Sequence, residues 1–290
     1  MQTTIGVDIG GTAIKAVHID PQGNVLDERT TPTVYEADAL VAAVRRLAEP
    51  WGDDPLGIAA PGLADEDHRW IAWMRGPMQI LEQLDWSARL DRPVPVVNDA
   101  QAATLAEAWT GAASGLRDVV LLTLGTGVGG GLILGGQLVS GRLGRVGSFG
   151  HLTLDLDGEP DLVGTPGSLE DLVGNHSVER RTGYASTELL VKAAQAGEPE
   201  AIKGWQRTIH ALACGINTII NTVSPQAVVL GGGISQAGEA LFDPLRKAVG
   251  GMEWQPDNQP TPILPARLGT WAGAIGAAYF AQHGARLPTA

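Results

Sequence analysis

The sequence predicts an α/β protein made of two related lobes. Short apolar runs typical of strands alternate with longer segments whose apolar residues recur at helical spacing. A unit of strand, glycine-rich tip, second strand and turn stands near the start of the chain and occurs again about 115 residues later. A length of 290 residues suits two domains of average size, and the repeat favours that division over one large domain.

The first copy of the repeat contains a candidate phosphate site. Apolar residues alternate from Ile5 to Ile9, and Gly10, Gly11 and Thr12 then turn the chain into a second strand. Asp8 stands near the end of the first strand. Glycines beside a hydroxyl residue allow backbone N–H groups to approach a phosphate closely, and a neighbouring carboxylate can hold Mg²⁺ directly or through water. An ordinary tight hairpin is the alternative for this copy taken alone.

The second copy repeats this pattern between residues 119 and 139. An apolar strand, the tip formed by Gly125, Thr126 and Gly127, a second apolar strand and a Gly-Gly turn follow one another. Two copies of one pattern indicate two lobes that each direct a glycine tip toward a shared cleft. The pair therefore predicts a nucleotide site more strongly than either copy does alone.

Two other strand ends carry candidate site residues. Asn98 and Asp99 lie between an expected strand and an Ala-rich helix, and open α/β sheets bind ligands at the carboxyl ends of their strands. The alternative role of Asp99 is to cap that helix. Gly231–Gly233 follow another strand, where glycines allow a nucleobase or ribose to lie against the backbone. A glycine-rich turn that binds no nucleotide is the alternative there.

Periodicity predicts the remaining elements. Expected helices cover residues 38–47, 79–90, 100–113, 199–223, 238–249 and 271–282, and expected strands cover residues 56–60, 94–97, 152–156, 226–230 and 262–266. The segment from Leu63 to Pro77 is rich in turn formers and is expected to be a loop. The single cysteine, Cys214, cannot form an internal disulfide and is expected in the core.

Composition narrows the class of protein. The net charge of −12 and the lack of any Lys/Arg block argue against nucleic acid or an anionic membrane as a partner. No apolar run reaches the roughly 20 residues that a membrane span needs, and the N-terminus shows no signal-peptide pattern. We therefore expect an acidic cytoplasmic enzyme.

The two tips, together with Val96–Ala103, Gly147–His151 and Val228–Ser235, resemble the ROK family of sugar kinases and repressors. The resemblance keeps the order of the family's motifs through nearly the whole chain. It implies the two-lobed, actin-like ATPase (ribonuclease H-like) fold with an interlobe cleft. The N-terminal α/β lobe would cover residues 1–112, completed by a C-terminal helix at about 271–290, and the larger C-terminal lobe would cover residues 113–270.

The resemblance also implies an activity and a site. The chain would be an ATP- and Mg²⁺-dependent kinase, glucokinase-like, that phosphorylates a sugar hydroxyl with Asp99 as base, and it would form a homodimer. The residues implied for the sugar are Gly62, Asn98, Asp99, His151 and Glu170. Those implied for ATP are Asp8, Gly10, Gly11, Thr12, Lys15, Gly125, Thr126, Gly127, Gly231, Gly232 and Gly233, with Asp8 also holding Mg²⁺, directly or through water.

The chain departs from the family pattern at a zinc loop. Asp161, Val163 and Ser168 stand where the family has three cysteines that bind zinc together with the histidine at 151. Valine offers no ligand atom, and one histidine with two weak oxygen donors does not make a closed structural zinc site. We therefore expect no structural zinc.

Other departures leave the substrate open. Trp73 replaces an asparagine and Ser148 replaces a glutamate that usually contact the sugar in this family. Three arginines stand in loops that would flank the pocket, namely Arg75, Arg142 and Arg145. Glucose, through its 6-hydroxyl, is the first candidate, and a sugar acid or a polyol is the alternative.

Two rival functions remain. Polyphosphate glucokinases share the Gly-Gly-Thr-x-Ile-Lys run seen at 10–15 and also lack the zinc cysteines, but Gly231–Gly233 and the Leu169-Glu170 pair favour ATP as donor. A non-catalytic sugar-sensing regulator would carry a helix-turn-helix before the first tip, whereas Asp8 is reached within eight residues of the start.

Overall fold

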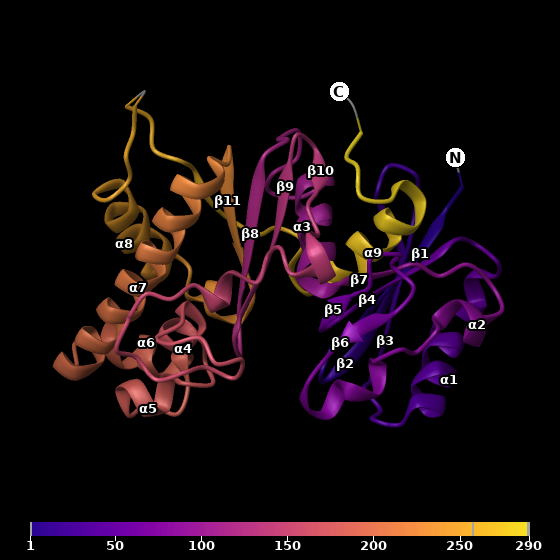
Figure 1. Ribbon diagram of the computed structural model, residues 1–290, viewed down its shortest axis with the longest axis horizontal. Coiled ribbons are helices and arrows are strands. Elements are labelled where there is room, and N and C mark those ends of the chain that lie inside the picture. The colour runs from indigo at the N-terminus through magenta and orange to yellow at the C-terminus, as the bar shows by residue number, and fades with distance from the viewer. Residues whose placement is uncertain (1, 257, 289–290) are drawn as a thin grey trace. The chain divides into compact units, whose positions relative to one another are not determined.

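Figure 1 shows a computed structural model, which describes residues 2–256 and 258–288. The residue contacts divide the chain into two compact units. Unit 1 comprises the chain up to Arg117, Gly131–Gly147, and the chain from Arg267 onward, and unit 2 comprises Asp118–Gly130 and Ser148–Ala266. A unit defined by contacts need not be a domain that folds alone, so the domain limits given above stay a prediction.

Unit 1 is built on a five-stranded sheet in the order β3-β2-β1-β4-β7. The central strand β1 is antiparallel to β2 and parallel to β4, which is parallel to β7. Ile5, Val7 and Ile9 are fully buried, as expected for a central strand that is covered on both faces. The strands are β1 (Thr4–Ile9), β2 (Ala13–Ile19), β3 (Val25–Pro32), β4 (Leu56–Ala60) and β7 (Val96–Asn98).

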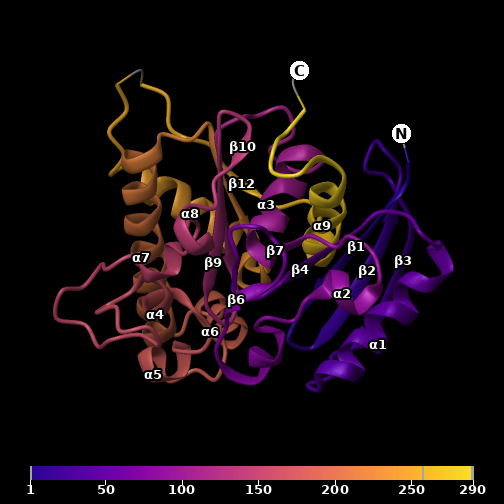
Figure 2. The same ribbon diagram turned by 45° about the vertical axis from the view of Figure 1, so that its right-hand side comes forward.

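Four α-helices complete the described part of unit 1, namely α1 (Ala37–Ala48), α2 (Trp86–Leu90), α3 (Asp99–Trp109) and α9 (Ala272–His283). Figure 2 shows α3 and α9 side by side, and α9 also packs on β1. Glycine makes these contacts possible. A Cβ atom on Gly276 would lie 1.8 Å from the carbonyl oxygen of Ala102 in α3, and one on Gly6 would lie 1.9 Å from that of Ala274. The expected C-terminal helix at 271–282 is therefore confirmed as an integral part of unit 1.

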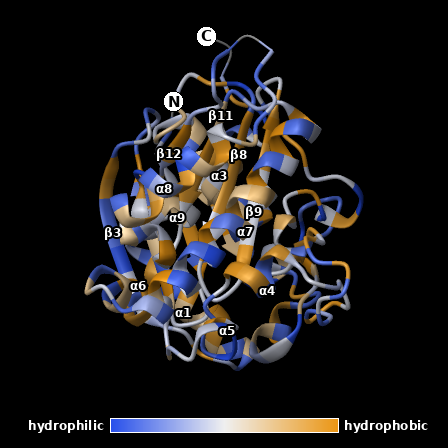
Figure 3. Cartoon of the chain, turned by 90° about the vertical axis from the view of Figure 1, so that its left-hand side faces the viewer, coloured by the Kyte–Doolittle hydropathy of each residue, from blue (hydrophilic) through white to orange (hydrophobic). Residues whose placement is uncertain are grey.

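Unit 2 contains three parallel strands. β8 (Val119–Leu124) pairs with β11 (Ala227–Gly231), which pairs with β12 (Ile263–Pro265). β8 and β11 consist almost wholly of hydrophobic residues (Figure 3) and are buried along nearly all their length. β9 (Val128–Leu134) begins in unit 2 and ends in unit 1, where β10 (Gln137–Leu138) pairs with it.

The helices of unit 2 gather around α7, which spans Pro199–Val223 as the sequence predicts. Proline suits the first turn, and Ser224 ends the helix in the left-handed conformation, with φ of 48°. The others are α4 (Leu169–Val173), α5 (Val178–Thr182), α6 (Thr187–Gln195) and α8 (Glu239–Gly250). The apolar side of α7 is buried against α4, α5, α6 and α8, so it gives no support to a homodimer, which stays a prediction.

Four sequence expectations are wrong in detail. The helix expected at 79–90 is split into a 3₁₀ turn and α2, because Gln83 takes φ of 56° and donates its N–H to Ile71 at 2.9 Å. The loop expected at 63–77 contains a short hairpin of β5 (Leu63–Ala64) and β6 (Ile71–Trp73). No strand forms at 152–156, since the N–H groups of residues 154 and 155 both bind one carbonyl, that of Gly167. Cys214 is only half-buried.

No helix within the described ranges is long and apolar enough to cross a membrane.

Candidate active site

The first glycine tip connects β1 and β2 in unit 1, and its three carbonyl groups are all engaged. The Thr33 hydroxyl donates to Gly10 at 2.6 Å, the Tyr35 hydroxyl donates to Gly11, and the Thr33 N–H donates to Thr12 at 3.0 Å. By contrast, the N–H groups of Gly11 and Thr12 have no hydrogen-bond partner among residues 2–256 and 258–288. The tip therefore offers donors rather than acceptors, as an anion site requires.

The second tip connects β8 and β9 in unit 2 and has the same property. The Asn175 N–H donates to the carbonyl of Gly125 at 2.9 Å, and the Gly125 N–H donates to that of Gly127 at 3.0 Å. The carbonyl of Thr126 accepts from both the N–H and the ring Nδ1 of His176, at 2.9 and 2.8 Å. Within the part of the chain that the structure describes, the N–H groups of Thr126 and Gly127 are again unpaired. Both tips that the repeat predicts therefore have engaged carbonyls and unpaired N–H donors within the described residues, which is the arrangement that an anion site needs.

Glu170 helps to shape the second tip. Its carboxylate accepts the N–H of Val128 at 2.8 Å, just past the tip. A Cβ atom on Gly127 would lie 2.1 Å from the same oxygen, so a larger residue at this position would displace the Glu170 carboxylate. Ser168 caps α4 through the N–H of Asp171, at 3.2 Å, and so fixes the helix that carries Glu170. Glu170 is predicted to accept a hydrogen bond from a sugar hydroxyl. One of its two carboxylate oxygens is therefore already hydrogen-bonded to the backbone.

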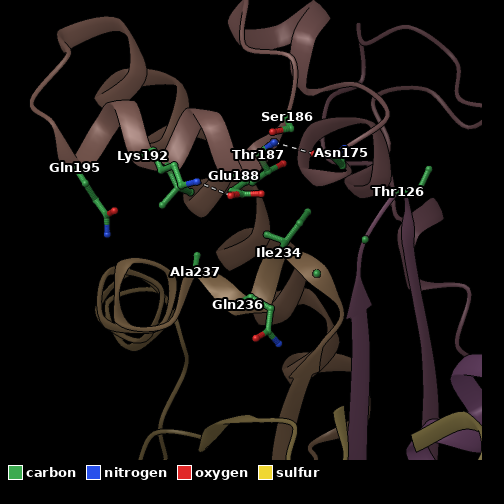
Figure 4. Close-up of a pocket in the computed structure, with 13 residues that line it drawn as sticks. Thr126, Asn175, Ser186, Thr187, Glu188, Lys192, Gln195, Ile234, Gln236 and Ala237 are labelled. Atoms are coloured by element: carbon green, nitrogen blue, oxygen red, sulfur yellow. Dashed lines mark hydrogen bonds and ion pairs between the residues drawn. The ribbon is translucent and has the colours of Figure 1, made fainter. Parts of the chain in front are cut away.

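A pocket of about 720 Å³ lies beside this tip, within unit 2 (Figure 4). Its size is that of a small-molecule site. One wall is the tip and Asn175, the second is α6, and the third is the turn after β11. The described residues that line it are Gly125, Thr126, Asn175, Ser186, Thr187, Glu188, Val191, Lys192, Gln195, Gly233, Ile234, Gln236 and Ala237.

Glycine is necessary in the turn after β11. Gly232 has φ of 87°, and a Cβ atom on it would lie 2.3 Å from the carbonyl oxygen of Leu124. Gly231 ends β11, and Gly233 lines the pocket. The structure therefore brings one end of the predicted adenosine turn and the second tip to the same pocket.

In unit 1, Asn98 joins the other predicted substrate residues. Its side-chain oxygen accepts the N–H groups of Ala100 and Gln101, each at 3.0 Å, so Asn98 is the N-cap of α3 and Asp99 is not. Its amide group donates to the Asp99 carboxylate at 3.0 Å and to the Gly62 carbonyl at 2.9 Å. The strand end thus holds Gly62, Asn98 and Asp99 together.

Asp8 and Asp99 are both buried in unit 1, and Asp99 affects the pKa of Asp8. The pKa of Asp8 rises to about 7, first because its side chain is buried and second because the Asp99 carboxylate is near. Lys15 acts in the opposite direction and lowers it. Burial also raises the pKa of Asp99, against hydrogen bonds from Ala100 and Asn98. Lys15 stands opposite Asp8 in the β1–β2 register and donates to the carbonyl of Thr270 at 3.1 Å. Two carboxylates in a poorly solvated place are a fitting environment for a divalent cation.

The residues at the zinc-loop positions do not fit zinc. His151 Nδ1 lies 2.7 Å from a carboxylate oxygen of Asp161, whose other oxygen accepts the N–H groups of Val163 and Thr165 at 2.9 Å each. Burial opposes this charge, but the hydrogen bonds outweigh it and hold the pKa of Asp161 below its ordinary value. Ser168 is used as the α4 cap. The His151–Asp161 hydrogen bond therefore links the segments that zinc would join.

We expect purified protein to contain far less than one zinc per chain. Because the loop is held by Asp161, a chelator should leave the melting temperature unchanged, and added Zn²⁺ should not raise it. Metal analysis and thermal unfolding with and without chelator test this. One tightly held zinc per chain would show that other ligands had been overlooked.

Four residues that position the tips were missed from the sequence, namely Thr33, Tyr35, Asn175 and His176. They lie 21 to 50 positions from the tip residues they bind, and no local pattern marks them. Of the residues expected to flank the substrate, Trp73 is 40% exposed with the Arg75 guanidinium 5.5 Å from its ring centre. Arg142, Arg145 and Ser148 are exposed.

Known proteins resemble this chain over almost its whole length. The glucokinase of Streptomyces coelicolor strain A3(2) is 32% identical over 98% of each chain. The N-acetyl-D-glucosamine kinase of Pectobacterium atrosepticum is 29% identical, over 94% of this chain and 97% of that protein. A ROK family glucokinase from Streptomyces griseus, solved in complex with glucose and AMPPNP, is 30% identical and superimposes with a TM-score of 0.81 over 97% of this chain and 100% of that one.

The structural match confirms the expected actin-like α/β fold. The sequence profile of the ROK family covers residues 4–284. The chain therefore belongs to the ROK family.

Proposed function

We propose that this protein is an ATP-dependent kinase that phosphorylates a hydroxyl of a hexose or a closely related sugar. One observation carries the proposal: both glycine tips have every carbonyl engaged and two N–H groups unpaired within the described chain, as a phosphate site requires. The relatives named glucokinase and N-acetyl-D-glucosamine kinase support the same reaction.

Unit 2 would bind the nucleotide. The 720 Å³ pocket accommodates an adenosine between the turn at Gly233 and α6, and the N–H groups of Thr126 and Gly127 would donate to phosphate oxygens. The glucokinase solved with AMPPNP supports an adenine nucleotide as donor. A polyphosphate donor would leave this pocket without a role, so we favour ATP over polyphosphate.

Unit 1 would activate the acceptor and hold the metal. A sugar hydroxyl is a poor nucleophile at neutral pH, and Asp99 would orient it and accept its proton as the bond to phosphorus forms. The raised pKa of Asp99 makes it a stronger base, and Asn98 fixes its position. Asp8 would hold Mg²⁺, directly or through water, and the unpaired N–H groups of the first tip would bind phosphate. Bound Mg²⁺ neutralises phosphate charge.

We propose that the residues which the family resemblance implies for the sugar do contact it, namely Gly62, Asn98 and Asp99 in unit 1, and His151 and Glu170 in unit 2. Since Nδ1 of His151 faces Asp161, its Nε2 is left to accept a sugar hydroxyl. Glucose is the first candidate, with phosphorylation at the 6-hydroxyl, because the relatives include glucokinases. We keep as predictions a cytoplasmic location, which was expected from the composition, and a homodimer, which the family resemblance implies.

An assay of the phosphorylated product across a panel of acceptors tests the proposal. The panel should contain glucose, mannose, N-acetylglucosamine, N-acetylmannosamine, gluconate and sorbitol, each with ATP, GTP or polyphosphate as donor. We expect ATP with a neutral hexose or N-acetylhexosamine to give the highest kcat/KM. Tight ATP binding without phosphorylated product from any acceptor would contradict the proposal and favour a regulator.

A further inference from the structure

Asn175 lies in the connection between α4 and α5, and its backbone holds it against the second tip. Its N–H donates to the Gly125 carbonyl at 2.9 Å, and the next N–H, that of His176, donates to the Thr126 carbonyl at 2.9 Å. Gly174 allows this close approach, because a Cβ atom there would lie 2.8 Å from the Thr126 carbonyl oxygen. The backbone of Asn175 is therefore held beside the first two residues of the tip.

The ring of His176 attaches the same connection to its surroundings. One ring nitrogen lies 2.8 Å from the Thr126 carbonyl oxygen, and the other lies 3.0 Å from a carboxylate oxygen of Asp171 in α4. The guanidinium of Arg180, in α5, donates to the second oxygen of Asp171 at 2.6 Å. The connection is thus bound to the tip and to both flanking helices, which restricts the backbone at Asn175.

The side chain of Asn175 is fixed by α6. Its Oδ1 accepts the N–H of Thr187 at 2.8 Å, drawn as a dashed line in Figure 4. Thr187 is the first residue of α6, so its N–H has no acceptor within the helix. A backbone N–H can only donate, so the side-chain atom that faces it is the amide oxygen. The NH₂ group of Asn175 therefore occupies the other position of the amide.

This NH₂ group is an unused donor. It has no hydrogen-bond partner among residues 2–256 and 258–288, and it is not one of the fully buried side-chain atoms that lack a partner. Asn175 lines the 720 Å³ pocket together with Gly125 and Thr126. The pocket wall beside the tip therefore carries an accessible side-chain donor whose orientation is already determined.

The chemistry of this donor matches a phosphate. An NH₂ group donates and does not accept, and phosphate oxygens accept, whereas ribose hydroxyls and the adenine edge carry both donors and acceptors. Of the described residues that line the pocket, Lys192 is the one cation, and its ammonium group lies 2.6 Å from the Glu188 carboxylate. The uncharged donors at the tip are thus the groups placed to bind phosphate oxygens.

We propose that Asn175 is a nucleotide-binding residue whose side-chain NH₂ group donates to a phosphate oxygen, alongside the N–H groups of Thr126 and Gly127. This inference rests on the proposed kinase function. Because the amide is held in place before the nucleotide arrives, binding does not have to order it. The NH₂ group therefore contributes to the affinity for ATP, and it contributes nothing to the affinity for adenosine, which has no phosphate.

Asn175→Ala and Asn175→Asp together test this role. Both remove the NH₂ group. Aspartate keeps an oxygen for the Thr187 N–H, whereas alanine adds no charge near the phosphates. We expect the Kd of ATP to rise roughly tenfold to a hundredfold in both variants, as for the loss of a hydrogen bond to a charged group, while the Kd of adenosine stays within about twofold. Calorimetric titration without an acceptor sugar measures these constants.

Two patterns would overturn the proposal. Equal losses of affinity for ATP and adenosine would show that Asn175 only supports α6 as a wall of the pocket. A loss for ATP in the aspartate variant alone would show repulsion by the added charge and no lost hydrogen bond. Gln206→Ala and Gln206→Glu, at an exposed amide of α7, are the matched controls and should leave every Kd unchanged.

Thermal unfolding establishes that the variants are folded. If Asn175→Ala does not fold, Asn175→Asp is titrated with ATP at low and high salt, because salt screens repulsion but does not restore a lost hydrogen bond. A loss of affinity that persists at high salt supports the proposal, and one that disappears overturns it.

The same measurements separate this inference from the kinase proposal. Parent protein that binds ATP but forms no phosphorylated product from any acceptor would contradict the kinase proposal and not this one. Asn175 variants that bind ATP as tightly as the parent, in a protein that does phosphorylate a sugar, would contradict this inference alone.

Discussion

Replacing Asp99 by asparagine is expected to lower turnover roughly 10²–10⁴-fold, the usual contribution of a general base. The substitution removes basicity and little else. Asn98, not Asp99, caps α3, and an amide oxygen at position 99 can still accept the N–H of Ala100, which lies 2.8 Å from the present carboxylate. The melting temperature and the affinity for ATP should therefore stay nearly unchanged.

Steady-state turnover with the best acceptor, thermal unfolding and ATP titration check this expectation together. Asp38→Asn is the matched control, since Asp38 also lies in the first turn of a helix of unit 1 but is exposed. A variant at 99 that kept a tenth or more of the parent turnover would remove Asp99 from the role of base. It would also reopen the assignment of the acceptor subsite.

Replacing Glu107 by alanine is expected to lower the free energy of unfolding by about 3–5 kcal/mol, because three partly buried N–H groups would lose their acceptor. The Glu107 side chain is fully buried. One oxygen accepts the N–H groups of Arg267 and Leu268, at 2.9 and 2.8 Å, and the other accepts that of Ala112 at 2.7 Å.

Urea unfolding measures this loss in the free energy of unfolding, and the m-value should not change. Glu49→Ala, in the same unit but on an exposed residue, is the control and should change stability by less than about 0.5 kcal/mol. A loss below about 1 kcal/mol at Glu107 would mean that water replaces the carboxylate. It would show that the chain around 267 is held by other contacts.

Much of this fold could be predicted from the sequence because local pattern and burial agree. The apolar residues of β1 and the apolar face of α7 are buried, and both glycine tips stand where the repeat placed them. The predictions failed where a distant partner decided the conformation. Gln83 pairs with Ile71, which breaks the helix expected there, and the Gly167 carbonyl takes two N–H groups that a strand at 152–156 would have needed.

The site shows the same limit. The repeat predicted the two tips but not the hydrogen bonds to their carbonyls, because different residues donate these bonds in the two copies. Hydroxyls of Thr33 and Tyr35 serve the first tip, whereas Asn175 and His176 serve the second. Sequence similarity between the copies ends before these partners, so only the folded chain could reveal them. Asp161 stands where the family resemblance implies a cysteine. Its hydrogen bond to His151 is likewise seen only in the folded chain.

The packing of α9 on β1 has a consequence for the order in which the protein becomes stable. β1 and its tip are synthesised before α9, and Gly6 of β1 is covered by the backbone around Ala274, more than 250 residues later. Residues 272–280 of α9 are all buried in unit 1. β1 therefore leaves the ribosome long before α9, the helix that covers its sheet, whereas the residues of unit 2 have all been made by position 266. The nascent chain thus completes its pocket-bearing unit before the unit that contains Asp99.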